Sequence, residues 1–129
     1  MPGKSAGGRR RILVIDDEPD IAGLLKLFLA GLHYEVDTFL SPRAGLDALK
    51  ENGYWAVFCD YMMPHLTGDR VYRAIKELDS ALLERFVLVT GAVLDERLER
   101  FVESEGARVL NKPFRLDEIK AVLKEFETS

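Results

Sequence analysis

Short apolar runs alternate with amphipathic stretches along most of this chain. Five runs, at residues 12–15, 34–40, 55–59, 86–89 and 108–110, are rich in β-branched and aromatic residues and predict strands. The runs at 12–15 and 55–59 are continuously apolar, which is typical of strands buried on both faces of a parallel sheet.

A stripe of apolar residues at helical spacing follows each of these runs and predicts a helix. The five stripes are Ile21, Leu24, Leu25, Phe28, Leu29 and Leu32; Ala44, Ala48 and Leu49; Val71, Ala74, Ile75 and Leu78; Leu94, Leu98, Phe101 and Val102; and Leu116, Ile119, Leu123 and Phe126. Pro19 and Ser41-Pro42 are good helix starts, and Asn52-Gly53 is a good helix end. Alternating strands and helices predict an α/β fold, a doubly wound five-stranded parallel sheet with helices on both faces.

Composition narrows the class of protein. The chain has 129 residues, 47% apolar and 31% charged, which suits one globular domain and excludes disorder throughout. We expect residues 1–10, which are Gly-rich and basic, to form a flexible tail before a domain at 11–127. Whether that domain stands alone or was cut from a longer protein stays open.

Charge and cysteine usage argue against several partners. The net charge is −4, and the basic residues cluster only at Lys4 and residues 9–11, so we expect no nucleic-acid binding by the folded part. Charges break every apolar stretch well before the roughly 18 residues that a membrane span needs. Met1 to Arg11 has no secretory pattern, and the single Cys59 cannot form an internal disulfide, so the cytoplasm is the expected compartment. We expect Cys59 to be a small core residue.

Residues with useful chemistry stand where four of the five predicted strands end. Asp16, Asp17 and Glu18 follow the first strand, Asp60 closes the third, Thr90 and Gly91 close the fourth, and Asn111, Lys112 and Pro113 close the fifth. Ligands of such sheets bind outside the carboxyl ends of the strands, so we expect these side chains to share one site.

Three aspartates held close together repel one another, so a positive charge is expected among them. Oxygen ligands of this kind suit Mg²⁺, and Lys112 supplies a second positive charge. A metal, a carboxylate, a lysine and the Thr90 hydroxyl are the parts needed for phosphoryl transfer. Asp60, the lone acid on a central strand, is the best nucleophile candidate, while Asp16 and Asp17 are better placed to hold the metal.

The order of these residues resembles the receiver domain of two-component response regulators of the chemotaxis-regulator type. The resemblance covers residues 11–126 and rests on Asp16-Asp17, Asp60 with Met63-Pro64 and Gly68, Thr90-Gly91, and Lys112-Pro113-Phe114. No single motif is very specific, but their joint order at successive strand ends is. The resemblance implies a flavodoxin-like sheet in the order 2-1-3-4-5 and a signalling domain rather than an enzyme.

The same resemblance implies a role for each site residue. Asp60 would accept a phosphoryl group from a phosphohistidine on a histidine kinase or histidine phosphotransfer domain. Mg²⁺ would be bound by Asp17, Asp60 and the backbone carbonyl of Met62, with Asp16 acting mainly through a water. Lys112 would pair with the phosphoryl oxygens and Thr90 would hydrogen-bond to them. A downstream protein target would then bind the face formed by the fourth predicted helix, the fifth strand and the last helix.

Three positions depart from, or vary within, the family pattern. Val109 stands where members usually carry an aromatic residue coupled to the threonine, so we expect output through Thr90 and residues 91–95 without a ring flip. Met62 and Ala92, two residues after Asp60 and Thr90, are apolar and cannot orient an attacking water, which predicts slow loss of the phosphoryl group.

Two alternatives remain open. A haloacid-dehalogenase-type phosphatase also uses a strand-end aspartate and Mg²⁺, but it usually has a second aspartate where this chain has Met62. A phosphorylation-independent interaction module on the same fold is favoured by Val109 and disfavoured by the complete set of acids, threonine and lysine.

Overall fold

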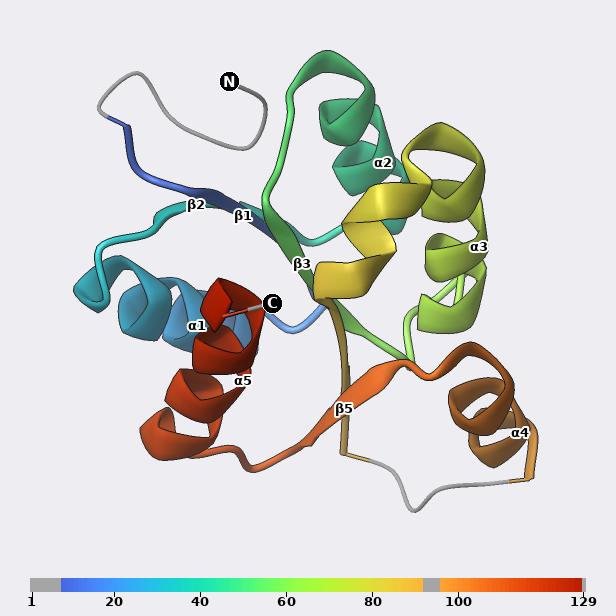
Figure 1. Cartoon of the computed structure of the whole chain (residues 1–129). Coiled ribbons are helices and arrows are strands. Elements are labelled where there is room, and N and C mark those ends of the chain that lie inside the picture. The colour runs from blue at the N-terminus through green and yellow to red at the C-terminus, as the bar shows by residue number, and fades with distance from the viewer. Residues whose placement is uncertain (1–7, 92–95, 129) are drawn as a thin grey trace.

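A computed structural model of the protein describes residues 8–91 and 96–128. Within these residues, five parallel strands form a sheet in the order β2-β1-β3-β4-β5 (Figure 1). The strands are β1 (Arg11–Ile15), β2 (Glu35–Phe39), β3 (Ala56–Asp60), β4 (Phe86–Thr90) and β5 (Arg108–Asn111). The predicted doubly wound parallel sheet and its implied strand order are confirmed.

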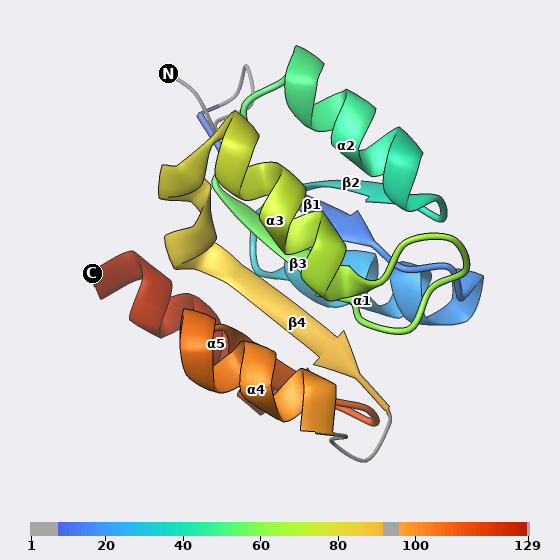
Figure 2. The same cartoon turned by 90° about the vertical axis from the view of Figure 1, so that its right-hand side faces the viewer.

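The helices cover both faces of this sheet. They are α1 (Pro19–Gly31), α2 (Pro42–Glu51), α3 (Gly68–Leu78), α4 (Glu96–Glu105) and α5 (Leu116–Thr128), with a short 3₁₀ helix, η1, at Ser80–Arg85. Helices α1 and α5 lie on one face, whereas α2, α3 and α4 lie on the other, which faces the viewer in Figure 2. No helix in residues 8–91 and 96–128 is long and apolar enough to cross a membrane.

Alternate residues of the buried strands supply the two halves of the core, because successive side chains of a strand point to opposite faces. Leu13 and Ile15 of β1 pack beneath α2, α3 and α4, with Val71, Ile75, Leu98 and Phe101 among their helical partners. Ile12 and Val14 pack beneath α1 and α5, with Leu25, Leu29, Ile119 and Leu123 among theirs. Each such buried aliphatic side chain contributes about 1.5–3 kcal/mol to folding.

Local sequence signals fix the helix ends. Pro19 begins α1, and the Ser41 side chain caps α2 by accepting a hydrogen bond from the backbone N–H of Ala44 at 3.3 Å, as predicted. Helix α1 ends at Gly31, and Asn52 follows the last residue of α2.

The element bounds differ slightly from the sequence predictions. Strand β2 is one residue shorter at each end than 34–40, and Trp55 lies just before β3. Asp60, Thr90 and Asn111 belong to their strands, because the pairing of Asp60 with Val89 and of Thr90 with Asn111 continues the ladders. Sequence periodicity missed η1, since six residues are too few to show a helical stripe. Leu94 and residues 1–7 lie outside the described part.

Candidate functional site

The parallel strands bring the predicted site residues to one edge of the sheet. Asp16 directly follows β1, Asp60 ends β3, Thr90 ends β4 and Lys112 directly follows β5. Asp16, Asp60 and Thr90 are 1%, 2% and 1% exposed, so three polar residues are buried at the carboxyl ends of the strands. Removing a polar group from water costs free energy, so buried polar groups usually have hydrogen-bond partners or bind ligands.

Four acids form the acidic cluster of the described part of the chain. Asp16, Asp17, Glu18 and Asp60 each offer a carboxylate oxygen, and these oxygens all lie within 4.8 Å of one another. Asp16 Oδ1 accepts a hydrogen bond from the backbone N–H of Glu18 at 2.9 Å. The buried Oδ2 of Asp16 lies 3.3 Å from Lys112 Nζ but makes no hydrogen bond within the described residues, so it can still interact with a cation or with its water. This set of oxygens fits a hard divalent cation.

Lys112 is the positive charge in contact with the acidic cluster. Its Nζ lies 2.9 Å from Glu18 Oε1, 3.3 Å from Asp16 Oδ2 and 3.3 Å from Asp60 Oδ1. Burial lowers the pKa of Lys112, but the hydrogen bond to Glu18 and the charges of Asp60 and Asp16 outweigh it and raise that pKa. Lys112 therefore stays protonated beside Asp60.

Two carboxyl groups of the cluster, those of Asp60 and Asp16, have raised pKa values. Burial, followed by the charge of Asp16, raises the pKa of Asp60 to about 7, although Lys112 opposes the shift. Burial also raises the pKa of Asp16, against the hydrogen bond from Glu18 and the charge of Lys112. A bound cation or a further hydrogen-bond donor would favour the charged forms, so the site is suited to bind one.

Gly68 allows the loop after β3 to pack closely against Asp60. A Cβ at this position would lie 2.6 Å from the Asp60 carbonyl oxygen and 2.9 Å from Tyr61 Cα. The backbone N–H of Gly68 donates to the Tyr61 carbonyl at 2.9 Å, which fixes the start of α3 beside the site. Met62, in the same loop, is 61% exposed.

Other residues considered in the sequence do not belong to the acidic cluster. Cys59 is fully buried, and burial raises the pKa of its thiol well above the ordinary value, so the prediction of a core residue is confirmed. Val109 is half-buried on β5. Ala92 and most of the 91–95 segment lie outside the described residues.

Sequence reasoning missed two features of this region. Glu18 was placed at the strand end without a role, yet it makes the shortest contact to Lys112. Asp69, for which the sequence predicted no role, is a buried acid, 3% exposed, in the first turn of α3. An acid directly after the site glycine, in an otherwise amphipathic helix, is the signal that could have found it.

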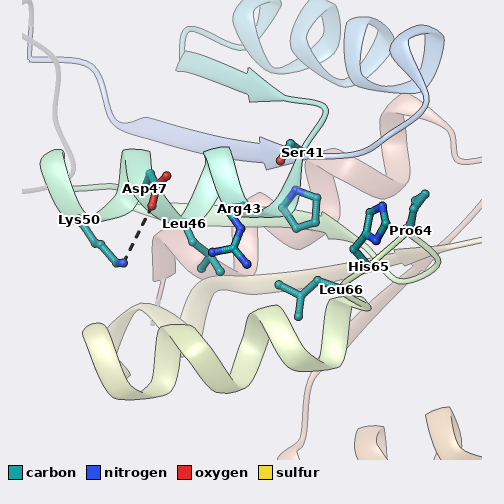
Figure 3. Close-up of a pocket in the computed structure, with 9 residues that line it drawn as sticks. Ser41, Arg43, Leu46, Asp47, Lys50, Pro64, His65 and Leu66 are labelled. Carbon is teal, nitrogen blue, oxygen red and sulfur yellow. Dashed lines mark ion pairs between the residues drawn. The ribbon is translucent and has the colours of Figure 1, made fainter.

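A groove of about 440 Å³ lies apart from the acidic cluster (Figure 3). It runs between α2 and the loop after β3, and its walls include Arg43, Leu46 and His65. Its charged residues are of both signs, and Lys50 lies 3.9 Å from Asp47. Because none of the acidic cluster lines it, the candidate chemistry lies at the strand ends instead.

Comparisons with known proteins identify the family of the chain. The sequence model of the response regulator receiver domain matches residues 12–124. The uncharacterized transcriptional regulatory protein YkoG of Bacillus subtilis is 30% identical over 113 residues, which are 88% of this chain and 49% of YkoG. The sensor histidine kinase RcsC of Salmonella typhi is 35% identical over 112 residues, which are 87% of this chain and 12% of RcsC.

The chain thus spans half the length, or less, of these two relatives. The solved structure of the chemotaxis protein CheY4 of Vibrio cholerae superposes with a TM-score of 0.82, covering 92% of this chain and 98% of that one at 22% identity. That likeness shows the fold. Because the family model spans most of its length, the chain belongs to the response regulator receiver domains, the signalling domains of two-component systems.

Proposed function

We propose that Asp60 is a phosphoacceptor, and that its phosphorylation by a phosphohistidine donor shifts a conformational equilibrium that controls a protein partner. The observation that carries the proposal is the contact between Lys112 Nζ and Asp60 Oδ1 at 3.3 Å, at a buried carboxylate surrounded by other acids. A protonated lysine at this distance from the nucleophile neutralises charge on an incoming phosphoryl group.

In the proposed reaction, a carboxylate oxygen of Asp60 attacks the phosphorus atom in line with the leaving group. An O–P bond forms, the N–P bond of the phosphohistidine breaks, and the imidazole of the donor leaves with the bonding electron pair. Lys112 pairs with one phosphoryl oxygen, and the Thr90 hydroxyl donates a hydrogen bond to another. The product is an acyl phosphate on Asp60.

We infer that Mg²⁺ is the resident cation. Asp17 and Asp60 would hold it with the backbone carbonyl of Met62. Asp16, whose buried Oδ2 contacts Lys112 Nζ but makes no hydrogen bond within the described residues, would hold one of its waters. When bound, it would neutralise the charge that develops on the phosphoryl oxygens.

A phosphoryl group adds up to about two negative charges in a small, partly buried space. Thr90 and Lys112 would move toward it, and with them the start of α4 and the end of β5. The α4-β5-α5 face is therefore the proposed binding surface for a downstream protein target, and a histidine kinase or histidine phosphotransfer domain is the proposed donor. The two arrangements of this face would form a two-state equilibrium.

The test is incubation of the protein with Mg²⁺ and acetyl phosphate, followed by intact-mass measurement. We expect the wild type to gain the mass of one phosphoryl group, and Asp60→Asn and EDTA-treated protein to gain none. A gain that persists in Asp60→Asn would refute the assignment of Asp60. No gain in the wild type would favour the phosphorylation-independent module, and turnover of a generic phosphomonoester would favour a phosphatase.

A further inference from the structure

Asp69 is a buried acid that the proposed phosphoryl chemistry does not use. It lies in the first turn of α3, and its side chain is 4% exposed. Oδ2 accepts a hydrogen bond from Arg97 Nη2 of α4 at 2.9 Å, while the buried Oδ1 makes no hydrogen bond within the described residues. A buried carboxylate with one half-exposed partner adds little net stability, so its effect is on which arrangement of α4 is favoured.

Burial alone would raise the pKa of Asp69. The adjoining Thr67 hydroxyl and the charge and hydrogen bond of Arg97 outweigh burial and lower that pKa below its ordinary value. Asp69 is therefore charged near neutral pH, and Arg97 is its charge partner.

The ion pair is one of several contacts between α3 and α4, and three of them are spaced about one turn apart along both helices. Asp69 meets Arg97, the rings of Tyr72 and Phe101 lie 5.0 Å apart, and Lys76 Nζ lies 3.3 Å from Glu105 Oε1. The Asp69–Arg97 contact is at the end of α4 that follows Thr90, whereas the Lys76–Glu105 contact is at the far end. Figure 2 shows the two helices on the same face of the sheet.

Asp69 is itself attached closely to the proposed phosphoacceptor. Its neighbour Gly68 packs so tightly that an added Cβ would lie 2.6 Å from the Asp60 carbonyl oxygen. The start of α3 therefore cannot move independently of the backbone at Asp60. On the other side, α4 begins six residues after Thr90, so Arg97 belongs to the first helical turn that follows Thr90 in the chain.

We propose that the Asp69–Arg97 ion pair is a latch, which holds the first turn of α4 against the loop after Asp60 in the unmodified protein, and that phosphorylation of Asp60 releases it. A displacement of Arg97 by about 1 Å suffices to break the hydrogen bond. The holding of α4 needs no phosphorylation, and only the release rests on the proposed function.

The first arm of the test measures amide hydrogen exchange of Phe101 and Val102 in the unmodified protein, because their helical hydrogen-bond acceptors are in the first turn of α4. We expect exchange to be about tenfold faster in Arg97→Gln and Asp69→Asn, since a hydrogen bond to a charged group is lost. Lys76→Gln is the matched control. It also removes one positive charge and one α3–α4 ion pair, and exchange should stay within about twofold of the wild type.

The double variant Asp69→Asn/Arg97→Gln should exchange no faster than the faster single variant, because both changes remove the same contact. Exchange of the α1 amides, measured in the same samples, should be unchanged and thereby exclude general unfolding. The latch would be overturned if the single variants exchanged at the same rate as Lys76→Gln. It would also be overturned if the rate increases of the two single variants multiplied in the double variant. Equal acceleration in α1 and α4 would overturn it as well, because the contact would then be merely structural.

The second arm adds Mg²⁺ and beryllofluoride, a phosphoryl mimic. We expect the mimic to speed exchange at Phe101 in the wild type and to change it by a much smaller factor in Arg97→Gln, which is already released. Equal factors in the two proteins would overturn the release. A wild type that does not respond would count against both the release and phosphorylation of Asp60, while the first arm would still decide whether the ion pair holds α4.

Discussion

The acidic cluster destabilises the folded protein, and Asp60→Asn should therefore make the protein more stable. Asp60 is 2% exposed and lies within 4.8 Å of the other acids of the cluster. Asparagine has nearly the same shape but carries no charge. The substitution removes the repulsion by Asp16 and the desolvation of a carboxylate, and it leaves Lys112 with Glu18 and Asp16 as partners.

The magnitude follows from the pKa of Asp60, which is raised from 3.8 to about 7. At about 1.4 kcal/mol for each pKa unit, the charged form of Asp60 costs the folded state roughly 4 kcal/mol above pH 7. The contact with Lys112 is already included in this pKa. The value is an upper limit, because the asparagine amide of the variant must itself be desolvated in the same buried place. We expect a gain of about 1–3 kcal/mol in the free energy of unfolding at pH 8.

The sign of the pH dependence is fixed by the direction of the shift. Below the unfolded-state pKa of 3.8, Asp60 is protonated in both states and costs nothing. Between about pH 4 and 7 the folded state binds more protons at Asp60 than the unfolded state does, so wild-type stability falls relative to the variant as pH rises. Above about pH 7 the difference stays constant.

Urea unfolding in EDTA, followed by fluorescence of the single Trp55, measures this difference at pH 5 and pH 8. We expect Asp60→Asn to exceed the wild type by a larger margin at pH 8. Adding Mg²⁺ at pH 8 should narrow the margin, because a cation that binds the native site stabilises the wild type. Asp47→Asn, at an exposed acid, is the control and should show no such pH dependence. Equal margins at the two pH values would refute the reasoning.

Two further predictions concern single positions. Gly68→Ala should lower the free energy of unfolding by about 1–3 kcal/mol, because its Cβ would meet the Asp60 carbonyl. Gly23→Ala, on the open surface of α1, should raise the free energy of unfolding by about 0.5–1 kcal/mol. Urea titration compares the two variants, and equal effects would contradict the packing argument. Met62→Asn combined with Ala92→Glu should speed the loss of phosphate from the phosphorylated protein by up to about 100-fold, since polar groups would then orient the attacking water. Intact-mass measurement over time gives the rate of this loss, and a rate equal to that of the wild type would contradict the prediction.

The sequence was sufficient to predict the sheet because its signals are periodic and local. The apolar run at 12–15 and the cap at Ser41 predict elements that form at those places. Helix α4 was predicted from Leu98 and Phe101, which are buried as expected, although the adjoining Leu94 lies outside the described residues. The short helix η1 could not be predicted, because a 3₁₀ helix of six residues is too short to show a periodic pattern of apolar residues.

The sequence predicted which residues form the candidate site, but it predicted only some of the contacts between their side chains. Strand order brings Asp16, Asp60 and Lys112 together, because parallel strands present their carboxyl ends to one edge. The contact of Lys112 with Glu18 depends on side-chain conformations, which spacing does not determine. Asp69 and Arg97 are 28 residues apart in sequence, and nothing in either segment indicates the other.

The charge of the acidic cluster indicates that, on the proposed function, the divalent cation binds before Asp60 is phosphorylated. Lys112 contacts Asp16, Glu18 and Asp60, and Asp17 is the fourth acid of the cluster. When all four acids are ionised, the cluster keeps an excess of negative charge. Phosphorylation would replace the single charge of Asp60 with up to about two, which increases that excess in a buried place. A divalent cation would more than offset the increase. Phosphorylation of Asp60 is therefore expected to require the cation first, and Lys112 alone is too little positive charge to substitute for it.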